Sequence, residues 1–403
     1  MSESSEAGWP ALRALRHANF RRYGAGLAVS LIGTWMQGTA QAWLVYRLTH
    51  SNLWLGTVQF AATIPILLLS PVAGLVADRY PRRSIIMLTQ SLFLLQATTL
   101  ALLTLTGRVT IAHVLALAAF FGFVNSLDIP SRQSLLPELV GRADLMYAVA
   151  LNSMAFQLAR VFGPALGGLS VAAWGEGVCF ALNAVSFGAV IAGLFFLKLP
   201  DPEPVEFTAP PWERLKEGFR HVRGSRELMG MLGLSAAVNV SVSPIFVLGP
   251  EIADGIFHRG PQGFGILTSA FGAGAVLGML GLVSRRSDAG LHRLILWSTA
   301  GAGLGFVAFS FVREFWMALA LMPVLGFTYM RQNAATNTTV QQAVPDELRG
   351  RLMGIYTMTV AGMIPIGSLL SGWCAEVWGA PVTLFLGGAG NLLAAAWFGA
   401  RHR

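Results

Sequence analysis

Long apolar runs, separated by short polar segments, make up most of this chain. Each run is close to the roughly 20 residues that an α-helix needs to cross a bilayer. The runs lack the polar face that an outer helix of a water-soluble protein would present. Twelve runs can be counted, and together they predict an all-α integral membrane protein. The predicted spans are 21–46, 53–77, 84–106, 109–131, 144–174, 177–198, 227–253, 262–284, 292–312, 315–340, 350–375 and 380–400.

The basic residues indicate the orientation in the membrane. If successive spans alternate in direction, nearly all Arg and Lys residues fall before the first span or after an even-numbered one. The opposite side receives four arginines, Arg47, Arg108, Arg259 and Arg313. Basic loops remain in the cytoplasm, so both termini are predicted to be cytoplasmic. Residues 1–19 lack the apolar core of a cleavable signal peptide, so we expect the first span to be retained.

The composition supports a membrane protein over other classes. Hydrophobic residues make up 54% of the chain and charged residues 12%, whereas about 25% of an average soluble domain is charged. The mean hydropathy is +0.59. A transmembrane β-barrel would need alternating strands of about ten residues, which the long apolar runs do not contain. The net charge of +8 is accounted for by loops on one side and requires no nucleic-acid partner.

Weak internal repetition predicts two six-helix halves. Gly-Leu-Val at 74–76 recurs at 281–283, each time before a basic loop. A span ending in Trp-Gly at 174–175 has a counterpart that ends in Trp-Gly at 378–379. Such duplication is typical of transporters that bind their substrate near the midplane between two halves. The predicted divisions are a cytoplasmic segment at 1–20, a six-helix bundle at 21–198, a cytoplasmic linker at 199–226 and a second six-helix bundle at 227–403.

The predicted linker has two parts. Five prolines between positions 200 and 211 prevent a continuous helix. Trp212, Leu215, Phe219 and Val222 then recur at helical spacing, with Arg and Glu between them. This pattern predicts an amphipathic helix on the cytoplasmic membrane surface, and a helix that binds a regulatory partner is the alternative.

The most charged loop lies between the second and third predicted spans. Residues 74–83 have the spacing Gly-x-x-x-Asp-Arg-x-x-Arg-Arg. This spacing resembles the loop 2–3 signature of the major facilitator superfamily, in which the loop is a latch that holds one conformation. Val76 and Pro81 stand where the family usually has Leu and Gly. The resemblance implies a gating motif made of Gly74, Asp78, Arg79, Arg82, Arg83 and, at the end of the fourth span, Asp128.

Small residues cluster in the fifth predicted span. Gly163, Gly167 and Gly168 leave a face against which another helix can pack closely. Pro164 bends the helix and frees a carbonyl. The pattern resembles the Gly-Pro-x-x-Gly-Gly signature that exporters of the major facilitator superfamily carry in helix 5. Generic small-residue packing is the alternative interpretation.

Two longer segments resemble a bacterial branch of this superfamily. Residues 126–140 and 151–160 are similar to the branch that holds enterobactin and related siderophore exporters and macrolide efflux proteins. The resemblance implies the two-bundle major facilitator fold and export across the bacterial inner membrane in exchange for protons. The sequence departs from better-understood drug exporters in two places. The first span has Gln37 and Gln41 but no carboxylate, and the fourth has apolar residues at 118–120 where many proton-coupled exporters have an arginine.

Two arginines lie inside predicted spans. A charge there normally faces the bundle interior, a partner or a wet cavity. Arg160 in the fifth span and Arg331 in the tenth are therefore candidates to attract an anionic substrate, with binding to helix-end carbonyls as the structural alternative. For the uncharged candidates, hydrogen bonding between helices is the alternative. They are Gln37, Asn125, Gln157, Asn239, Gln332 and Asn333.

Asp128 is the predicted proton-binding carboxylate, because it is the acid of the N-terminal half that we place within reach of the cavity. A purely latching role is the alternative for this residue. Glu251 and Asp254, near the other end of the seventh span, are alternative proton sites.

No pattern in the sequence indicates an enzyme. The seven histidines are scattered without metal-ligand spacing, so no metal or other cofactor is expected. A phosphate-binding loop is missing, which argues against ATP as the energy source. Cys179 and Cys374 are interpreted as small apolar packing residues, although their positions would permit a disulfide.

Together these features predict a secondary exporter of a siderophore, drug or related small metabolite. We expect a proton-coupled monomer in the bacterial inner membrane that works by alternating access between its two halves. Its expected partners are the substrate, protons and the lipid bilayer. A facilitator or importer and a lipid flippase on the same fold are alternatives, and a polytopic membrane enzyme is a more remote one.

Overall fold

The computed structural model describes residues 10–197, 220, 222–284, 290–343 and 346–401. Helices account for all of the regular structure in these residues. The N-terminal half comprises η1 (Pro10–Arg16), α1 (Ala18–Thr49), α2 (Asn52–Arg79), α3 (Arg82–Leu105), α4 (Ile111–Trp174) and α5 (Glu176–Phe195). The C-terminal half comprises α7 (Arg226–Val247), α8 (Gly249–Glu251), η2 (Ile252–Ile256), α9 (Gly260–Val283), α10 (Leu291–Ser310), α11 (Phe315–Gln342), α12 (Asp346–Trp378) and α13 (Ala380–Arg401).

The helix α4 contains two of the predicted spans, because a kink rather than a loop joins them. At the kink Gly141 has φ +73° and ψ 169°, which breaks the helical path. A positive φ is accessible to glycine at no steric cost, so this position suits the residue. The chain therefore reverses direction within a single continuous element.

The remaining spans agree with the prediction to within a few residues, apart from the seventh. Its predicted helix at 227–253 ends at Val247, and α8 and η2 follow. Pro250 has no backbone N–H to donate, which is one reason why the helix is interrupted there.

Nine helices in the described part of the chain are long and apolar enough to cross a membrane. The helix α4 is one of these although it crosses twice, and the more polar α1 and α11 are not among them. Counting these crossings gives the twelve spans that the sequence predicts. The all-α membrane fold class is confirmed.

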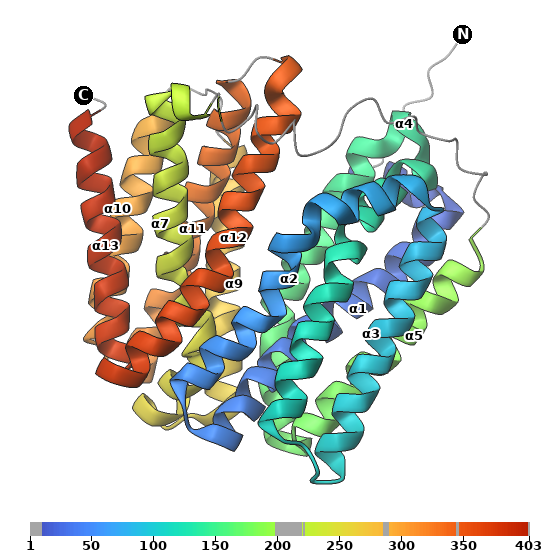
Figure 1. The fold of residues 1–403 in the computed structure, drawn as a ribbon, viewed down its shortest axis with the longest axis horizontal. Coiled ribbons are helices and arrows are strands. Elements are labelled where there is room, and N and C mark those ends of the chain that lie inside the picture. Colours follow the sequence, from blue (N-terminus) through green and yellow to red (C-terminus); the bar gives the residue numbers. More distant parts are fainter. Residues whose placement is uncertain (1–9, 198–219, 221, 285–289, 344–345, 402–403) are drawn as a thin grey trace.

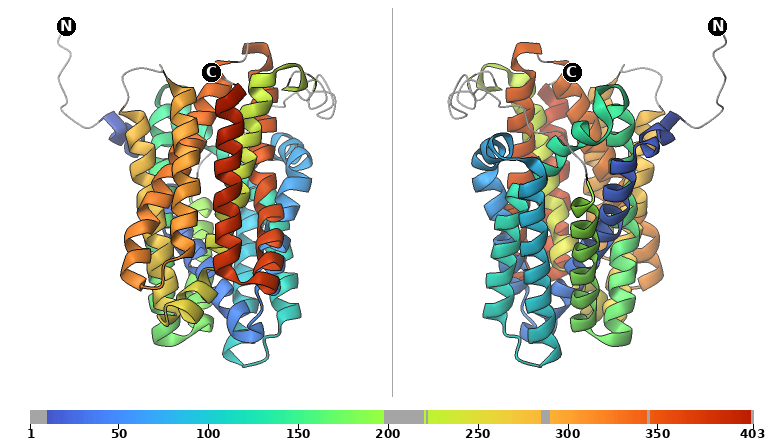
Figure 2. Two further views of the ribbon diagram at one scale, coloured as in Figure 1. Left: turned by 90° about the vertical axis from the view of Figure 1, so that its left-hand side faces the viewer. Right: turned by 90° about the vertical axis from the view of Figure 1, so that its right-hand side faces the viewer.

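The helices form two bundles that stand side by side, α1–α5 in one and α7–α13 in the other (Figure 1). The element η1 and the last turn of α13 lie at the same end of the molecule in all views (Figures 1 and 2). We call this the terminal end, and the opposite end the distal end. The predicted amphipathic linker helix falls almost wholly outside the described residues.

Two glycine-lined helix crossings join the bundles toward the distal end. A Cβ added to Gly56 of α2 would lie 2.5 Å from the Ser368 carbonyl oxygen and 3.0 Å from the Gly372 Cα of α12. A Cβ added to Gly168 of α4 would lie 2.4 Å from the Pro261 carbonyl oxygen of α9. Such close backbone approach is possible only with very small residues. In Figure 1 the bundles diverge from these crossings toward the terminal end.

Candidate functional site

A cavity of about 420 Å³ lies between the two bundles, and we call it the arginine chamber. Seven helices, three from the N-terminal half and four from the C-terminal half, contribute to its wall. The lining residues are Thr34, Trp35, Gly38, Thr39, Ala42, Gln59, Phe156, Arg160, Pro164, Val242, Ser243, Phe246, Phe264, Thr268, Tyr329, Ile364 and Ser368. A cavity of this size, with a mostly apolar wall and a few polar groups, is typical of a binding site for a small molecule.

Among the described residues that line the arginine chamber, Arg160 is the one with a charged side chain. It comes from α4, whereas the rings around its guanidinium come from the other half. The guanidinium carbon lies 6.0 Å from the ring centre of Phe246, 5.6 Å from that of Phe271 and 5.8 Å from that of Tyr329. Its buried Nε has no hydrogen-bond partner in the described structure. Aromatic faces attract a cation but accept few hydrogen bonds, so an anionic ligand would find donors still available.

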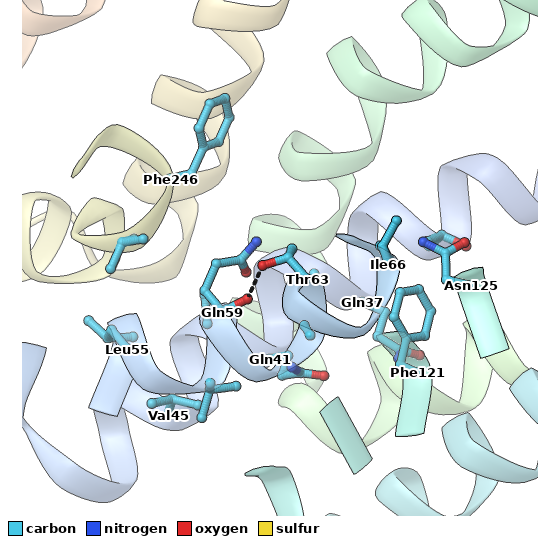
Figure 3. Close-up of a pocket in the computed structure, with 16 residues that line it drawn as sticks. Gln37, Gln41, Val45, Leu55, Gln59, Thr63, Ile66, Phe121, Asn125 and Phe246 are labelled. Atoms are coloured by element: carbon cyan, nitrogen blue, oxygen red, sulfur yellow. Dashed lines mark hydrogen bonds between the residues drawn. The ribbon is translucent and has the colours of Figure 1, made fainter. Parts of the chain in front are cut away.

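A second cavity of about 200 Å³ adjoins the first, and we call it the amide chamber (Figure 3). Its polar side chains are amides and hydroxyls from α1, α2 and α4. The lining residues are Thr34, Gln37, Gly38, Gln41, Ala42, Val45, Leu55, Val58, Gln59, Ala62, Thr63, Ile66, Phe121, Asn125, Phe246 and Val247. Five of these also line the arginine chamber, so the two cavities share part of their wall.

Three of the sequence candidates line these cavities, namely Gln37, Asn125 and Arg160. The side chain of Gln37 nevertheless forms its hydrogen bonds with residues of its own half. Its amide donates to Gln96 Oε1 at 3.0 Å and accepts from Asn183 Nδ2 at 2.8 Å. Gln37 therefore both lines the amide chamber and forms hydrogen bonds to other helices.

The other candidates lie behind the wall or away from it. Asn239 and Asn333 hydrogen-bond to each other at 3.1 Å, and the Tyr329 hydroxyl donates to Asn239 Oδ1 at 3.1 Å. Asn239 therefore holds the hydroxyl of Tyr329, which lines the arginine chamber, whereas Asn239 and Asn333 line neither chamber. Gln332 donates to Thr336 within its own helix. The Arg331 guanidinium carbon lies 5.4 Å from the Phe327 ring centre.

Gln157 lies at the contact between α4 and α9, where its Nε2 is 3.9 Å from Met279 Sδ. Gln157 therefore lies between the halves and lines neither chamber.

Two charged residues of the predicted gating motif, Asp128 and Arg82, form ion pairs within the N-terminal half. Asp128 is buried, forms an ion pair of 2.5 Å with Arg132, and accepts from Thr89 Oγ1 at 2.6 Å and Gln90 Nε2 at 2.9 Å. Arg82 forms an ion pair with Glu138 of α4.

The rest of the gating motif lies at the end of α2 and the start of α3. Arg83 donates to the Phe195 carbonyl at 2.9 Å, and Arg79 is exposed. Gly74 would meet nothing within 4 Å if it carried a Cβ. The side chain of Asp78 lies outside the described residues. Asp128 lines neither chamber, which weakens its case as the proton-binding residue.

The glycines of the helix-5 motif lie at helix contacts, on two sides of α4. A Cβ on Gly163 would come within 2.4 Å of Trp35 Cβ, and one on Gly167 within 2.9 Å of the Met36 carbonyl oxygen, both on α1. Gly168 contacts α9 of the other half, as described above. Pro164 lines the arginine chamber. The motif therefore packs α4 against its own bundle and against the opposite one.

Sequence reasoning missed several residues of the arginine chamber. Tyr329 and Ser243 line it, as does Gln59 at its junction with the amide chamber. The signal for Tyr329 was its place one turn before Asn333 in the polar stretch of α11. Phe246 carried no signal, because a phenylalanine in an apolar span is ordinary packing.

An acidic cluster joins the halves at the distal end. Glu376 of α12 accepts from Ser51 Oγ at 3.0 Å and from the Leu53 backbone N–H at 3.1 Å, at the start of α2. Glu251 lies nearby, and its buried Oε2 has no hydrogen-bond partner in the described structure. Burial raises the pKa of Glu251 above its ordinary value, opposed by a hydrogen bond from Asn52 and helped by the Glu376 charge.

The described residues hold no cluster of His, Cys, Asp or Glu that could bind a metal ion. Cys179 and Cys374 are both free thiols. Cys179 is fully buried in the core of its half, as the packing interpretation expects. The permitted disulfide is not formed.

Comparison with known proteins gives the class of this chain. Residues 10–403 match the family described as transmembrane secretion effector. The chain belongs to this family, a branch of the major facilitator superfamily. Membership confirms the predicted superfamily and a role in transport rather than in catalysis.

Curated relatives extend along most of the chain. It is similar to the staphyloferrin A transporter of Staphylococcus aureus, with 26% identity over 86% of this chain and 87% of the relative. It is also similar to the enterobactin exporter EntS of Shigella boydii, with 28% identity over 88% of this chain and 85% of the relative.

The fold is similar to that of a bacterial homologue of the iron transporter ferroportin in an inward-facing state. The TM-score is 0.76 at 15% identity, and the match covers 96% of this chain and 98% of the other. At this identity the likeness shows the fold alone.

Proposed function

We propose that this chain exports a small organic anion, of the siderophore or related metabolite class, from the bacterial cytoplasm in exchange for protons. The observation that carries the proposal is Arg160, a guanidinium in a cavity between the halves with no acidic side chain in the described wall. An uncompensated guanidinium in such a place favours anions, and its planar fork suits carboxylates and catecholates. The siderophore substrates named for two relatives are in keeping with this chemistry.

Alternating access would operate by rocking the two bundles about the central cavity. Support comes from the distal crossings at Gly56 and Gly168, which bring the backbones of the two bundles into contact toward that end. We assign the terminal end to the cytoplasm, from the positions of the basic residues. In this assignment the present conformation is open toward the cytoplasm and closed on the outside, with 21–198 and 227–403 as the moving halves.

The topology can be tested separately from transport. A cysteine at position 82, in a background without Cys179 and Cys374, should react with a membrane-impermeant maleimide in everted vesicles and stay unreactive in intact cells. Labelling from outside intact cells alone would refute the assignment.

For the proton step we propose Glu251 in place of Asp128. Asp128 is enclosed by Arg132, Thr89 and Gln90, whereas Glu251 lies between the halves with a carboxylate oxygen that has no donor. A protonated Glu251 is compatible with the neighbouring Glu376, because two close carboxylates resist being charged together. Protonation of Glu251 from outside the cell would then favour the conformation in which the distal end is closed.

The proposed function is tested with variants of Arg160. Arg160→Lys keeps the charge and loses the fork, so efflux of an anionic substrate should fall about tenfold and efflux of an apolar dye should change little. Arg160→Gln should abolish efflux of the anion. Efflux of both compounds would be followed in cells that produce equal amounts of each variant. Equal loss for both compounds, with poor production of the protein, would show that Arg160 only holds the helices together.

A further inference from the structure

We infer that the amide chamber is a second substrate-binding subsite, which takes the neutral hydrogen-bonding part of a molecule whose anionic end lies at Arg160. The inference rests on the proposed function and adds the chemistry of the substrate. The transported molecule is an acid that also carries amide, hydroxyl or similar uncharged polar groups.

The first support is a set of three free amides in one cavity. Gln41 of α1, Gln59 of α2 and Asn125 of α4 line the chamber, and their side chains form no hydrogen bond with other described residues. The dashed line in Figure 3 runs from Thr63 Oγ1 to the main-chain oxygen of Gln59 at 2.8 Å, so the Gln59 amide stays available. Each amide offers two N–H donors and one acceptor oxygen to a ligand.

Gln37 supplies an internal comparison. Its amide nitrogen donates to Gln96 and its amide oxygen accepts from Asn183, so the residue forms part of a network within its own half. An amide that only stabilises the bundle is expected to be satisfied in this way. Gln41, Gln59 and Asn125 come from three different helices and converge on one space without such partners. This arrangement is typical of a binding site, where a few polar groups orient a ligand in a mostly apolar wall.

The chamber also discriminates between ligand groups by charge. No charged side chain is among the described residues that line it, and the rest of the wall includes Leu55, Val58 and Phe121. An ionised group would lose its hydration there without meeting an opposite charge, which is costly. Neutral amides and hydroxyls can exchange their water for the three free side chains at little cost.

A single molecule can occupy both chambers. Gln59 and Phe246 line each of them, from α2 of one half and α7 of the other. The arginine chamber alone has about 420 Å³, and pockets for drug-sized ligands typically have about 300–1,000 Å³. An elongated acid would therefore place its anion at Arg160 and extend its polar part past Gln59 toward Asn125.

Two probes of equal length and charge test this inference. Benzoylglycylglycine has one carboxylate and two amides, and 7-phenylheptanoate has the same carboxylate without amides. Binding of both to the purified full-length protein in detergent would be measured by calorimetry. Gln59→Leu and Asn125→Leu should each weaken benzoylglycylglycine binding by about three- to tenfold, the loss expected for one hydrogen bond. Binding of 7-phenylheptanoate should change by less than about twofold, because it makes no such bond.

Additional variants separate folding from binding. Gln59→Glu keeps the size of the side chain but removes donors and adds charge, so it should also weaken benzoylglycylglycine binding. Gln262→Leu replaces an exposed glutamine of α9 that lines neither chamber, and both probes should bind it as they bind the unchanged protein.

The outcomes distinguish the inference from the proposed function. Loss of affinity for both probes upon Arg160→Gln, with no selective loss in the Gln59 and Asn125 variants, would overturn the amide subsite and leave the proposed anion site standing. If the unchanged protein binds neither probe, the proposed function fails and the inference fails with it.

Discussion

The two ends of the interface between the halves are built from different interactions. At the distal end, Gly56 meets Gly372 and Gly168 meets Gly265 at backbone contact, and Glu376 accepts hydrogen bonds from the start of α2. Toward the terminal end the described ion pairs of the gating region stay within the N-terminal half, as for Arg82 with Glu138. Cross-half contacts at one end and within-half pairs at the other are consistent with bundles that separate at the terminal end.

The two glycine crossings are related by the internal repeat of the chain. Gly168 precedes Trp174 by the same number of residues as Gly372 precedes Trp378. Gly168 of α4 contacts Gly265 near the start of α9. In the same way, Gly372 of α12 contacts Gly56 near the start of α2. The duplicated sequence therefore produces a duplicated distal contact.

The largest effect is expected from Gly168→Leu. The new side chain would meet the backbone of α9, and overpacking of this kind typically costs about 1–3 kcal/mol. Because this overpacking destabilises the conformation in which the distal end is closed, efflux should drop at least about tenfold. Efflux rates would be compared at matched amounts of protein.

Gly188→Leu is the matched control for this substitution. An added Cβ at Gly188 of α5 would meet nothing within 4 Å, so efflux should stay near that of the unchanged protein. Normal efflux in the Gly168→Leu variant would show that the distal contact has no role in transport.

Asp128→Asn should affect stability more than coupling. The substitution leaves Arg132 without its carboxylate in a mostly buried site, which is strongly destabilising. The thermal midpoint of the protein in detergent should fall by about 5 °C or more. Glu227→Gln, which removes an exposed pair with His292, is the control and should change the midpoint little. Stable Asp128→Asn protein that has lost its response to a pH gradient would restore Asp128 as the proton site.

Glu251→Gln should remove the pH dependence of the distal contact. A carboxyl whose pKa is raised in the closed state favours that state while protonated. Closure is then favoured at low pH and lost as pH rises from the ordinary value of 4.5 through the raised pKa. Spin labels at positions 53 and 377 would report the distance between α2 and α12 across this range. A pH-dependent distance that survives Glu251→Gln would exclude this residue as the sensor.

The smallest effect is expected from Tyr329→Phe. The hydroxyl donates to Asn239 at 3.1 Å, while the ring faces Arg160. Phenylalanine keeps the ring and loses one hydrogen bond, so affinity for the anionic probe should fall by about two- to fivefold. Calorimetry with 7-phenylheptanoate measures this change, and a loss as large as that of Arg160→Gln would show that the hydroxyl itself binds the ligand.

The sequence predicts the fold well because long apolar runs and loop arginines are local signals. The kink at Gly141 was not predicted, since its positive φ depends on how the two parts of α4 pack. The residues that line the two chambers differ in their sequence signal: Arg160 and Asn125 stand out as polar residues in apolar spans, whereas Phe246 does not. Asp128 was placed near the cavity from its position along the span, and its enclosure by Thr89 and Gln90 requires the three-dimensional packing of α3 against α4.

The proposed proton-driven export through the arginine chamber is tested most directly in everted membrane vesicles. With an imposed pH gradient, acid inside, vesicles that contain the unchanged protein should accumulate benzoylglycylglycine, and Arg160→Gln vesicles should not. Dissipating the gradient should stop accumulation. Equal accumulation by the Arg160→Gln vesicles, or accumulation that is indifferent to the gradient, would contradict the account.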